Sequence, residues 1–232
     1  VGANRADIMG FTALGLFHAI ADALKMFTKE DFVPQGANRF LHTLSPIIAV
    51  IPAILTFAVV PFGGQYDLWG TNVNLVISDL DVGLLFVFAI ASIATYGYVI
   101  SGWASNNNWS LLGSMRTASQ MISYEVTMGL TIVGVLMVFG TMKLTEIGAA
   151  QEDFLSWGFF LQPLGFFMFL AASIAENKRI PFDAPEAESE LVAGYFTEYS
   201  GLKFGMFFMA EFIEMVTIGA IVTILFFGAW HI

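Results

Sequence analysis

Acidic side chains gather in one polar stretch, residues 176–199, of an otherwise apolar sequence. The carboxylates of this stretch are Glu176, Asp183, Glu186, Glu188, Glu190 and Glu198. Asp183, Glu186 and Glu190 are spaced i, i+3 and i+7, so on a helix they would share one face. Carboxylates that repel one another hold a proton more tightly than an isolated glutamate. The spacing therefore indicates proton handling, whereas the simpler interpretation is a solvated acidic loop.

The same stretch contains a predicted helix start. Asp183 can cap free backbone amides, Pro185 is tolerated in a first turn, and Glu186 occupies the place of a capping-box acid. A short helix is therefore expected to begin near Asp183, within the acidic loop.

A second set of carboxylates falls inside apolar segments. These residues are Glu125, Glu176, Glu211 and Glu214. A charge at bilayer depth costs about 2.5–3.5 kcal/mol on insertion scales, so such residues are rarely accidental. Glutamates on several helices are what a proton relay requires. The alternative is structural pairing with a cation, since Arg179 lies near Glu176 in sequence and Lys203 lies two turns from Glu211.

The composition is typical of a membrane protein. Of the 232 residues, 57% are hydrophobic, 12% are charged and 24 are Phe, whereas a soluble domain carries roughly 25% charged residues. The net charge of −10 argues against nucleic acid as a partner and against a basic patch for anionic lipid.

The chain contains no Cys, which excludes disulfides, thiolate metal sites and iron–sulfur ligands of its own. His18, His42 and His231 do not lie deep in an apolar run, which argues against a haem held by paired histidines within the bilayer. No metal-ligand spacing and no glycine-rich phosphate loop is found. Electrons that move nearby must therefore be carried by a partner or a diffusible cofactor.

Five apolar segments of sufficient length predict an all-α membrane protein. They span about residues 41–62, 82–103, 117–140, 158–175 and 202–230. Residues 12–27 have apolar positions at helical spacing, interleaved with His18, Asp22 and Lys25. This pattern predicts an amphipathic helix at the membrane interface, and the alternative is a helix packed on the protein itself. Residues 1–232 are expected to form a single polytopic membrane domain, with loops at residues 63–81, 104–116 and 141–157.

Basic residues are distributed unevenly between the two sides of the predicted bundle. Eight of the nine fall on the side of the acidic loop, and only Lys143 falls on the other side. Because basic residues favour the cytoplasmic side, the acidic loop is expected to be cytoplasmic.

The acidic stretch carries a specific resemblance. Residues 175–195 read Ala-Glu-Asn-Lys-Arg-Ile-Pro-Phe-Asp-Ala-Pro-Glu-Ala-Glu-Ser-Glu-Leu-Val-Ala-Gly-Tyr, and Glu198-Tyr199-Ser200 follow. Together with Ala21–Lys25, Gly36–Arg39, Ser123–Val126 and Phe207–Phe212, this motif resembles the H subunit of proton-translocating NADH:quinone oxidoreductase, the respiratory complex I. The mitochondrial counterpart is NADH dehydrogenase subunit 1. The resemblance covers nearly the whole chain.

The resemblance implies that the chain lines a quinone chamber and couples quinone reduction to proton translocation. The residues that match the family's proton relay are Glu125, Glu176, Glu186, Glu190 and Glu211. Those that match positions on or near the quinone passage are Asp22, Lys25, Arg179, Phe182, Asp183 and Phe208.

The resemblance further implies that the chain binds no cofactor of its own and meets quinone as a substrate. NADH, FMN and the iron–sulfur clusters are expected in partner subunits of complex I. The expected neighbours are the peripheral-arm subunits at the quinone site, which carry the terminal cluster, the small membrane-arm subunits and the lipid bilayer of a bacterial inner membrane.

The chain departs from the family pattern at both ends. The family begins with one more span, whereas this chain opens at Val1, and it stops at Ile232 before the family's last spans. Two alternatives remain at this stage. One is a proton- or cation-coupled transporter that uses the same carboxylates, although no inverted repeat is visible. The other is the related subunit of a membrane-bound hydrogenase.

Overall fold

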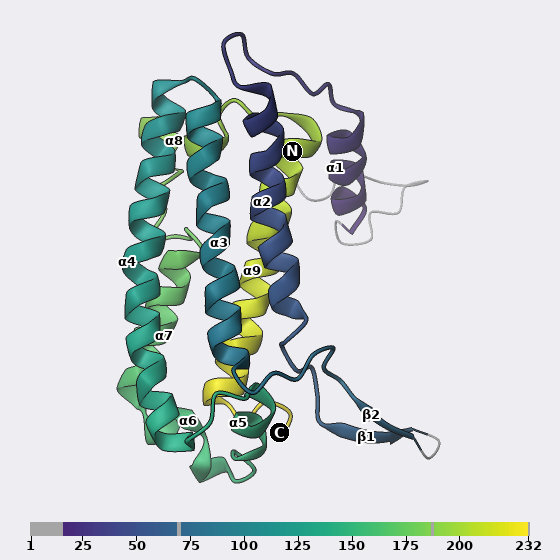
Figure 1. Cartoon of the computed structure of the whole chain (residues 1–232), viewed down its shortest axis with the longest axis vertical. Coiled ribbons are helices and arrows are strands. Elements are labelled where there is room, and N and C mark those ends of the chain that lie inside the picture. Colours follow the sequence, from purple (N-terminus) through teal and green to yellow (C-terminus); the bar gives the residue numbers. More distant parts are fainter. Residues whose placement is uncertain (1–15, 69–70, 187, 232) are drawn as a thin grey trace.

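The computed structural model describes residues 16–68, 71–186 and 188–231 as a bundle of long helices (Figure 1). Its α-helices are α1 (Leu16–Thr28), α2 (Arg39–Phe57), α3 (Gly83–Ala104), α4 (Asn108–Phe139), α5 (Leu144–Ala149), α6 (Gly158–Leu161), α7 (Pro163–Glu176), α8 (Glu188–Leu191) and α9 (Gly201–Phe226). Two single-turn 3-10 helices are η2 (Phe154–Ser156) and η3 (Gly194–Phe196). The opening at Val1 and the first part of the predicted amphipathic helix, residues 12–15, lie outside the described residues.

The prediction of an all-α membrane protein is confirmed. Helices α2, α3, α4 and α9 are long and apolar enough to cross a membrane. The largest difference in their bounds is at α4, which begins at Asn108 rather than near Thr117. The side chain of Asn107 accepts a hydrogen bond from the backbone N–H of Trp109 and caps this helix. Polar residues expected in a loop therefore extend α4 beyond its apolar part.

The predicted span at residues 158–175 is not one continuous helix. It is divided at Gln162 into α6 and α7, and the 14 residues of α7 reach only about 21 Å. Pro163, the first residue of α7, has no backbone N–H and interrupts the helix, while the side-chain amide of Gln162 donates to the backbone carbonyl of Gly134 on α4 at 2.6 Å. Figure 1 shows that α7 ends well below the upper end of α4. The acidic loop therefore begins inside the bundle.

Two loops contain structure of their own. Strands β1 (Gln65–Leu68) and β2 (Thr71–Asn74) form an antiparallel hairpin in a region predicted to be a loop. Short helices within the acidic loop are confirmed by α8 and η3.

The predicted helix start at Asp183 is wrong, because residues 184–186 form a turn and α8 begins at Glu188. Instead, residues 185 and 186 pack against Gly194, the first residue of η3. A Cβ atom at Gly194, whose φ is +59°, would lie 2.3 Å from the carbonyl oxygen of Pro185.

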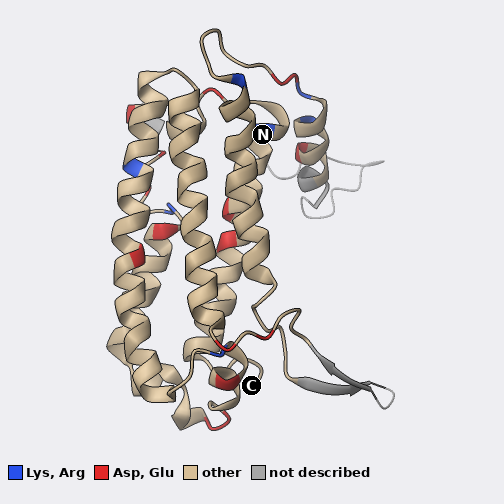
Figure 2. Cartoon of the chain, viewed as in Figure 1, with Lys and Arg blue, Asp and Glu red and all other residues tan. Residues whose placement is uncertain are grey.

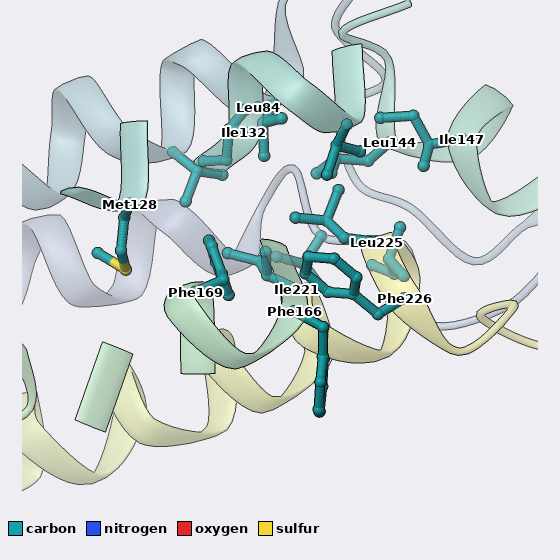
Figure 3. Packing of buried hydrophobic residues seen from close by; sticks show 14 of the residues in the cluster. Leu84, Met128, Ile132, Leu144, Ile147, Phe166, Phe169, Ile221, Leu225 and Phe226 are labelled. Atoms are coloured by element: carbon teal, nitrogen blue, oxygen red, sulfur yellow. The ribbon is translucent and has the colours of Figure 1, made fainter. Parts of the chain in front are cut away.

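The buried apolar side chains form two clusters. The first joins α3, α4, α5, α7 and α9 (Figure 3) and includes Leu84, Ile132 and Phe169. The second joins α2, α3, α9 and η3, and its largest members include Tyr98 and Tyr195. Along α9, most residues of the second cluster come before Glu211, and the residues of the first cluster come after Glu214. The two carboxylates therefore lie where one cluster gives way to the other. Figure 2 shows acidic positions at mid-height of the bundle as well as near its ends.

Candidate functional site

The centre of the candidate site is a buried ion pair between Lys178 and Glu211. Nζ of Lys178 lies 3.1 Å from Oε1 of Glu211, and the two side chains are 0% and 4% exposed. Nη2 of Arg179 lies 3.9 Å from the other carboxylate oxygen. Removing two charges from water is costly unless their geometry is good and further hydrogen bonds complete it. The arrangement around the pair supplies those bonds.

Two tyrosines complete the surroundings of the pair. The hydroxyl of Tyr195 donates to Oε1 of Glu211 and lies 3.3 Å from Nζ of Lys178. The same Nζ lies 3.6 Å from the ring centroid of Tyr98, a cation–π distance. Burial, followed by the negative charge of Glu211, holds the pKa of Tyr195 well above its ordinary value. Tyr195 is therefore a neutral hydroxyl that can both donate and accept a proton.

A small internal cavity lies beside this cluster. Its volume is about 40 Å³, and its lining includes Glu176, Glu214, Thr56 and Thr217 among apolar side chains. One carboxylate oxygen of Glu176 is buried and has no hydrogen-bond partner within the described residues. A water molecule in a cavity needs about two to four polar partners, and the few polar side chains of this otherwise apolar lining could supply them. Glu176 and Glu214 thus face the same small space.

Glu125 reaches the same region from α4. Its carboxylate is hydrogen-bonded to the hydroxyl of Ser92 on α3. The same hydroxyl lies 2.9 Å from the carbonyl oxygen of Phe88. A hydroxyl has one proton and cannot donate to both acceptors at once. Glu125 therefore accepts from Ser92 when ionised and can donate to it when protonated. Glu125 also interacts electrostatically with Glu176, which lines the cavity.

Glu186 approaches the cluster from the acidic loop. Burial, and then the negative charge of Glu211, raises the pKa of Glu186 from 4.5 to about 7, and the positive charge of Lys178 opposes this rise. Asp183 also acts on Glu186, and Oδ1 of Asp183 is buried with no hydrogen-bond partner within the described residues. The loop thus holds a carboxyl group that exchanges protons near neutral pH.

A row of phenylalanines follows one face of α9. Phe204, Phe208 and Phe212 are spaced i, i+4 and i+8, with ring centroids 4.7 and 6.4 Å apart. Phe204 lines a groove of about 220 Å³ between α1 and α9, together with Asp22 and Lys25. At the other end the guanidinium of Arg179 lies 5.4 Å from the ring of Phe212. This aromatic row leads from the groove at α1 to the buried cluster.

The sequence pattern of the NADH dehydrogenase family matches residues 1–232. The chain belongs to this family. Among similar curated proteins is the H 1 subunit of NADH-quinone oxidoreductase from Geobacter metallireducens, 52% identical over 217 residues, which cover 94% of this chain and 65% of the relative. The H 2 subunit from Syntrophobacter fumaroxidans is 49% identical over 231 residues, covering 99% of this chain and 67% of the relative. The H subunit from Flavobacterium psychrophilum is 47% identical over 231 residues, covering 100% and 66%.

The chain thus spans about two thirds of the length of these curated relatives. Their names confirm the predicted resemblance to the H-subunit family of NADH-quinone oxidoreductase.

The residues expected to form a proton relay fall in two places. Glu211 belongs to the buried cluster and Glu176 lines its cavity, while Glu125 and Glu186 interact electrostatically with Glu176 and Glu211, respectively. Glu190 lies apart on the surface, where its carboxylate forms a 2.8 Å ion pair with Arg116, and the two side chains are 62% and 45% exposed.

The residues expected on or near a quinone passage also form two groups. Asp22 and Lys25 are exposed on α1 and line its groove. Arg179, Phe182 and Asp183 lie at the start of the acidic loop, where the ring of Phe182 contacts Tyr124 at 5.4 Å. Phe208 stands in the aromatic row between the two groups.

Sequence reasoning missed several residues of the site. Lys178 gave no signal, because a lysine that follows an apolar segment is usually solvated. Tyr98 and Tyr195 are distant in sequence and meet only through packing. The spacing of Phe204, Phe208 and Phe212 could have been found, since i, i+4 repeats mark one helix face. Lys203, weighed as an alternative partner of Glu211, pairs with Asp31 at 3.1 Å.

Proposed function

We propose that this complex I membrane subunit lines the quinone chamber and couples quinone reduction to proton translocation. One observation carries the proposal. The buried Lys178–Glu211 pair stands between the aromatic row of α9 and the cavity lined by Glu176 and Glu214. A change of charge at a quinone headgroup beside the row would act directly on buried carboxylates, because electrostatic interactions are strong where water is excluded.

The proposed proton path starts in the acidic loop. Glu186 exchanges a proton near neutral pH, and Tyr195 links the loop to Glu211. Waters in the cavity would then carry protons to Glu176 and Glu214 and onward to the Ser92–Glu125 pair. The Tyr195–Glu211 and Ser92–Glu125 steps join groups in direct hydrogen-bond contact, and the other steps would run through water. Glu190, with its surface pairing, would be the solvent-facing member of the relay.

The proposed quinone passage runs along α9. Flat apolar surfaces with a few polar groups at the end are typical of sites for small aromatic ligands. Phe204, Phe208 and Phe212 provide the surface, and Asp22 and Lys25 stand at its outer end. At its inner end Arg179, Phe182 and Asp183 would hold the headgroup.

The redox partners and the membrane side complete the proposal. NADH, FMN and the iron–sulfur clusters would belong to partner subunits, with the terminal cluster in a peripheral-arm subunit at the quinone site. The small membrane-arm subunits would pack on the bundle. The membrane is proposed to be a bacterial inner membrane, and the bias of basic residues supports a cytoplasmic acidic loop.

The test uses Glu211→Gln in the intact complex in membrane vesicles. Inhibitor-sensitive NADH:quinone activity and proton pumping are expected to fall together, while native gels show an assembled complex. Glu152→Gln is the matched control, since Glu152 is exposed in the loop between α5 and η2, and it is expected to keep both activities.

Two results would contradict the proposal. If the Glu211→Gln complex reduces quinone at the full rate, the carboxylate of Glu211 is not needed to couple quinone reduction to proton translocation. Absence of a large NADH-oxidising complex around the unmutated chain would favour a transporter, or the related hydrogenase subunit if hydrogen is consumed instead.

A further inference from the structure

Lys178 is the most deeply buried charge of the site. It lies two residues beyond the end of α7 and has a left-handed backbone, with φ of +54°. Its side chain is 0% exposed. Because α7 ends inside the bundle, the ammonium group lies among α3, α9 and η3 rather than in solvent.

The three N–H groups of this ammonium have three partners. Nζ lies 3.1 Å from Oε1 of Glu211, 3.3 Å from the hydroxyl of Tyr195 and 3.6 Å from the ring centroid of Tyr98. An ammonium has three donors and no acceptor. Lys178 is therefore fully engaged, and its geometry suits a fixed charge rather than a ligand-binding or proton-carrying group.

Acidic groups outnumber cations around Lys178. The titratable and charged groups that face it or its neighbours are Glu211 and Glu214 on α9, Tyr98 on α3, Tyr195 on η3, Glu125 on α4, Asp183 and Glu186 in the loop, and Glu176 and Arg179 on its own segment. Beyond its contact with Glu211, Lys178 acts electrostatically on Glu176, Glu186 and Glu214. So many carboxylates cannot all be ionised in a low dielectric, so the cluster must share protons.

We propose that Lys178 is the fixed positive charge that pairs with Glu211 and thereby sets how many protons the buried carboxylates hold together. Lys178 is a positioning residue that acts through Glu211 and its neighbours. This role rests on the proposed function, because the protons it controls are those supplied to the quinone reaction. Loss of the charge makes the remaining carboxylates hold their protons more tightly, so the cluster titrates at higher pH.

The experiment compares Lys178→Met with Lys178→Arg in the intact complex. Lys178→Met is expected to move the pH profile of quinone reduction to higher pH by about one unit or more. Lys178→Arg keeps the charge and is expected to keep the position of the profile, whatever its effect on rate. If Lys178→Met lowers the maximal rate of quinone reduction but leaves the pH profile at the same position, the proposal is overturned, because a purely structural role predicts that result.

Two further variants serve if Lys178→Met does not assemble. Glu211→Gln leaves Lys178 unneutralised and is expected to move the profile to lower pH. Lys178→Met combined with Glu211→Gln removes both charges, so its profile is expected at higher pH than that of Glu211→Gln. Coincident profiles of these two variants would show that the charge of Lys178 has no effect.

A readout without turnover separates this role from the proposed function. Infrared difference spectra of the purified complex follow the carbonyl band of protonated carboxylic acids as the pH is changed. Loss of this band is expected at higher pH in Lys178→Met than in the unmutated complex. If quinone reduction is absent from every sample, the proposed function fails, while an infrared shift still supports the role of Lys178 and an unchanged titration refutes it.

Discussion

The imidazole of His42 lies face to face with the phenol ring of Tyr199, with ring centroids 4.0 Å apart and planes 2° from parallel. His42 is buried near the start of α2, whereas Tyr199 ends the acidic loop. Nδ1 of His42 lies 3.5 Å from Nζ of Lys203, and Nε2 lies 3.4 Å from the carbonyl oxygen of Glu198. Lysine can only donate, so Nδ1 accepts and Nε2 carries the proton. A neutral imidazole thus ties the loop to α2 and α9.

Loss of the Tyr199 ring is expected to loosen this end of the acidic loop. Tyr199→Ala should reduce stability by about 3–5 kcal/mol, as for other buried aromatic truncations. Tyr199→Phe keeps the stacked ring and loses only long hydroxyl contacts to Ser45 and Ser101, so it should cost less than about 1.5 kcal/mol. Thermal unfolding of the purified complex ranks the two variants. An equal loss of stability in both variants would mean that the hydroxyl group, rather than the ring stacking, stabilises this end of the loop.

The stability of the loop should depend on pH through Glu186. Its pKa is raised by burial, and then by the charge of Glu211, from 4.5 to about 7. The unfolded chain therefore releases this proton at lower pH than the folded chain does. The stability from neutral Glu186 is fully present below pH 4.5 and is lost as the pH rises to about 7.

Unfolding temperatures measured across this range can test the effect. Glu186→Gln is expected to gain stability relative to the unmutated complex as the pH rises from about 4.5 to about 7, with a constant difference above that range. Glu190→Gln is the matched control because Glu190 is exposed. A constant difference between Glu186→Gln and the unmutated complex throughout the range would contradict the prediction.

The ion pair of Arg116 and Glu190 allows a test of whether Glu190 is structural or part of the relay. Exposed pairs contribute about 0.2–1 kcal/mol and weaken in salt. Arg116→Gln and Glu190→Gln are therefore expected to show a small coupling energy in a double-mutant cycle, lost at high salt. If Glu190 also relays protons, Glu190→Gln lowers proton pumping while Arg116→Gln does not. Equal pumping in the two variants would leave Glu190 a surface pair only.

The helical architecture could be predicted from hydropathy, because apolar length decides which segments can cross a bilayer. Hydropathy does not report the backbone, however. The break at Gln162 is marked in the sequence by Pro163, which lacks a backbone N–H, and a hydropathy average does not register it. The polar start of α4 depends on the cap at Asn107 rather than on apolar length.

The acids of the site could be predicted from their positions and their motif, but the cation that pairs with them could not. Lys178 is buried because Tyr98 and Tyr195 close over it, and these residues lie far apart in sequence. Lys203 lies two turns from Glu211 along the chain, and the fold brings it to Asp31. Pairings of this kind depend on tertiary packing.

Close approach of α3 and α4 should depend on Gly102. A Cβ atom at this position would lie 2.3 Å from Oγ of Ser114 and 2.5 Å from the carbonyl oxygen of Ser110. Gly102→Ala is therefore expected to destabilise the subunit by about 1–3 kcal/mol through overpacking. At Gly129, also helical, no atom of the described residues lies within 4 Å of such a Cβ, so Gly129→Ala should be neutral or stabilising. Thermal unfolding distinguishes the two, and a harmless Gly102→Ala would show that the helices can separate at little cost.

The aromatic row of α9 should determine quinone affinity more than turnover. Phe208 stands between Phe204 and Phe212, with its ring 4.7 Å from the first and 6.4 Å from the second. Phe208→Leu keeps an apolar side chain but removes the flat surface, and aromatic contacts are worth about 0.5–1.5 kcal/mol beyond their area. The KM for quinone is therefore expected to rise roughly two- to tenfold, with little change in kcat.

The matched control for the row is Phe154→Leu, in η2 near the opposite end of the bundle. Its ring contacts Trp157 and Phe160, so the same substitution perturbs an aromatic group that is remote from α1 and the acidic loop. An unchanged KM is expected. If Phe208→Leu instead lowered kcat and left KM unchanged, the row would act on the chemistry or on proton delivery rather than on binding. Equal effects of both substitutions would indicate a general loss of packing, and the quinone passage would have to lie elsewhere.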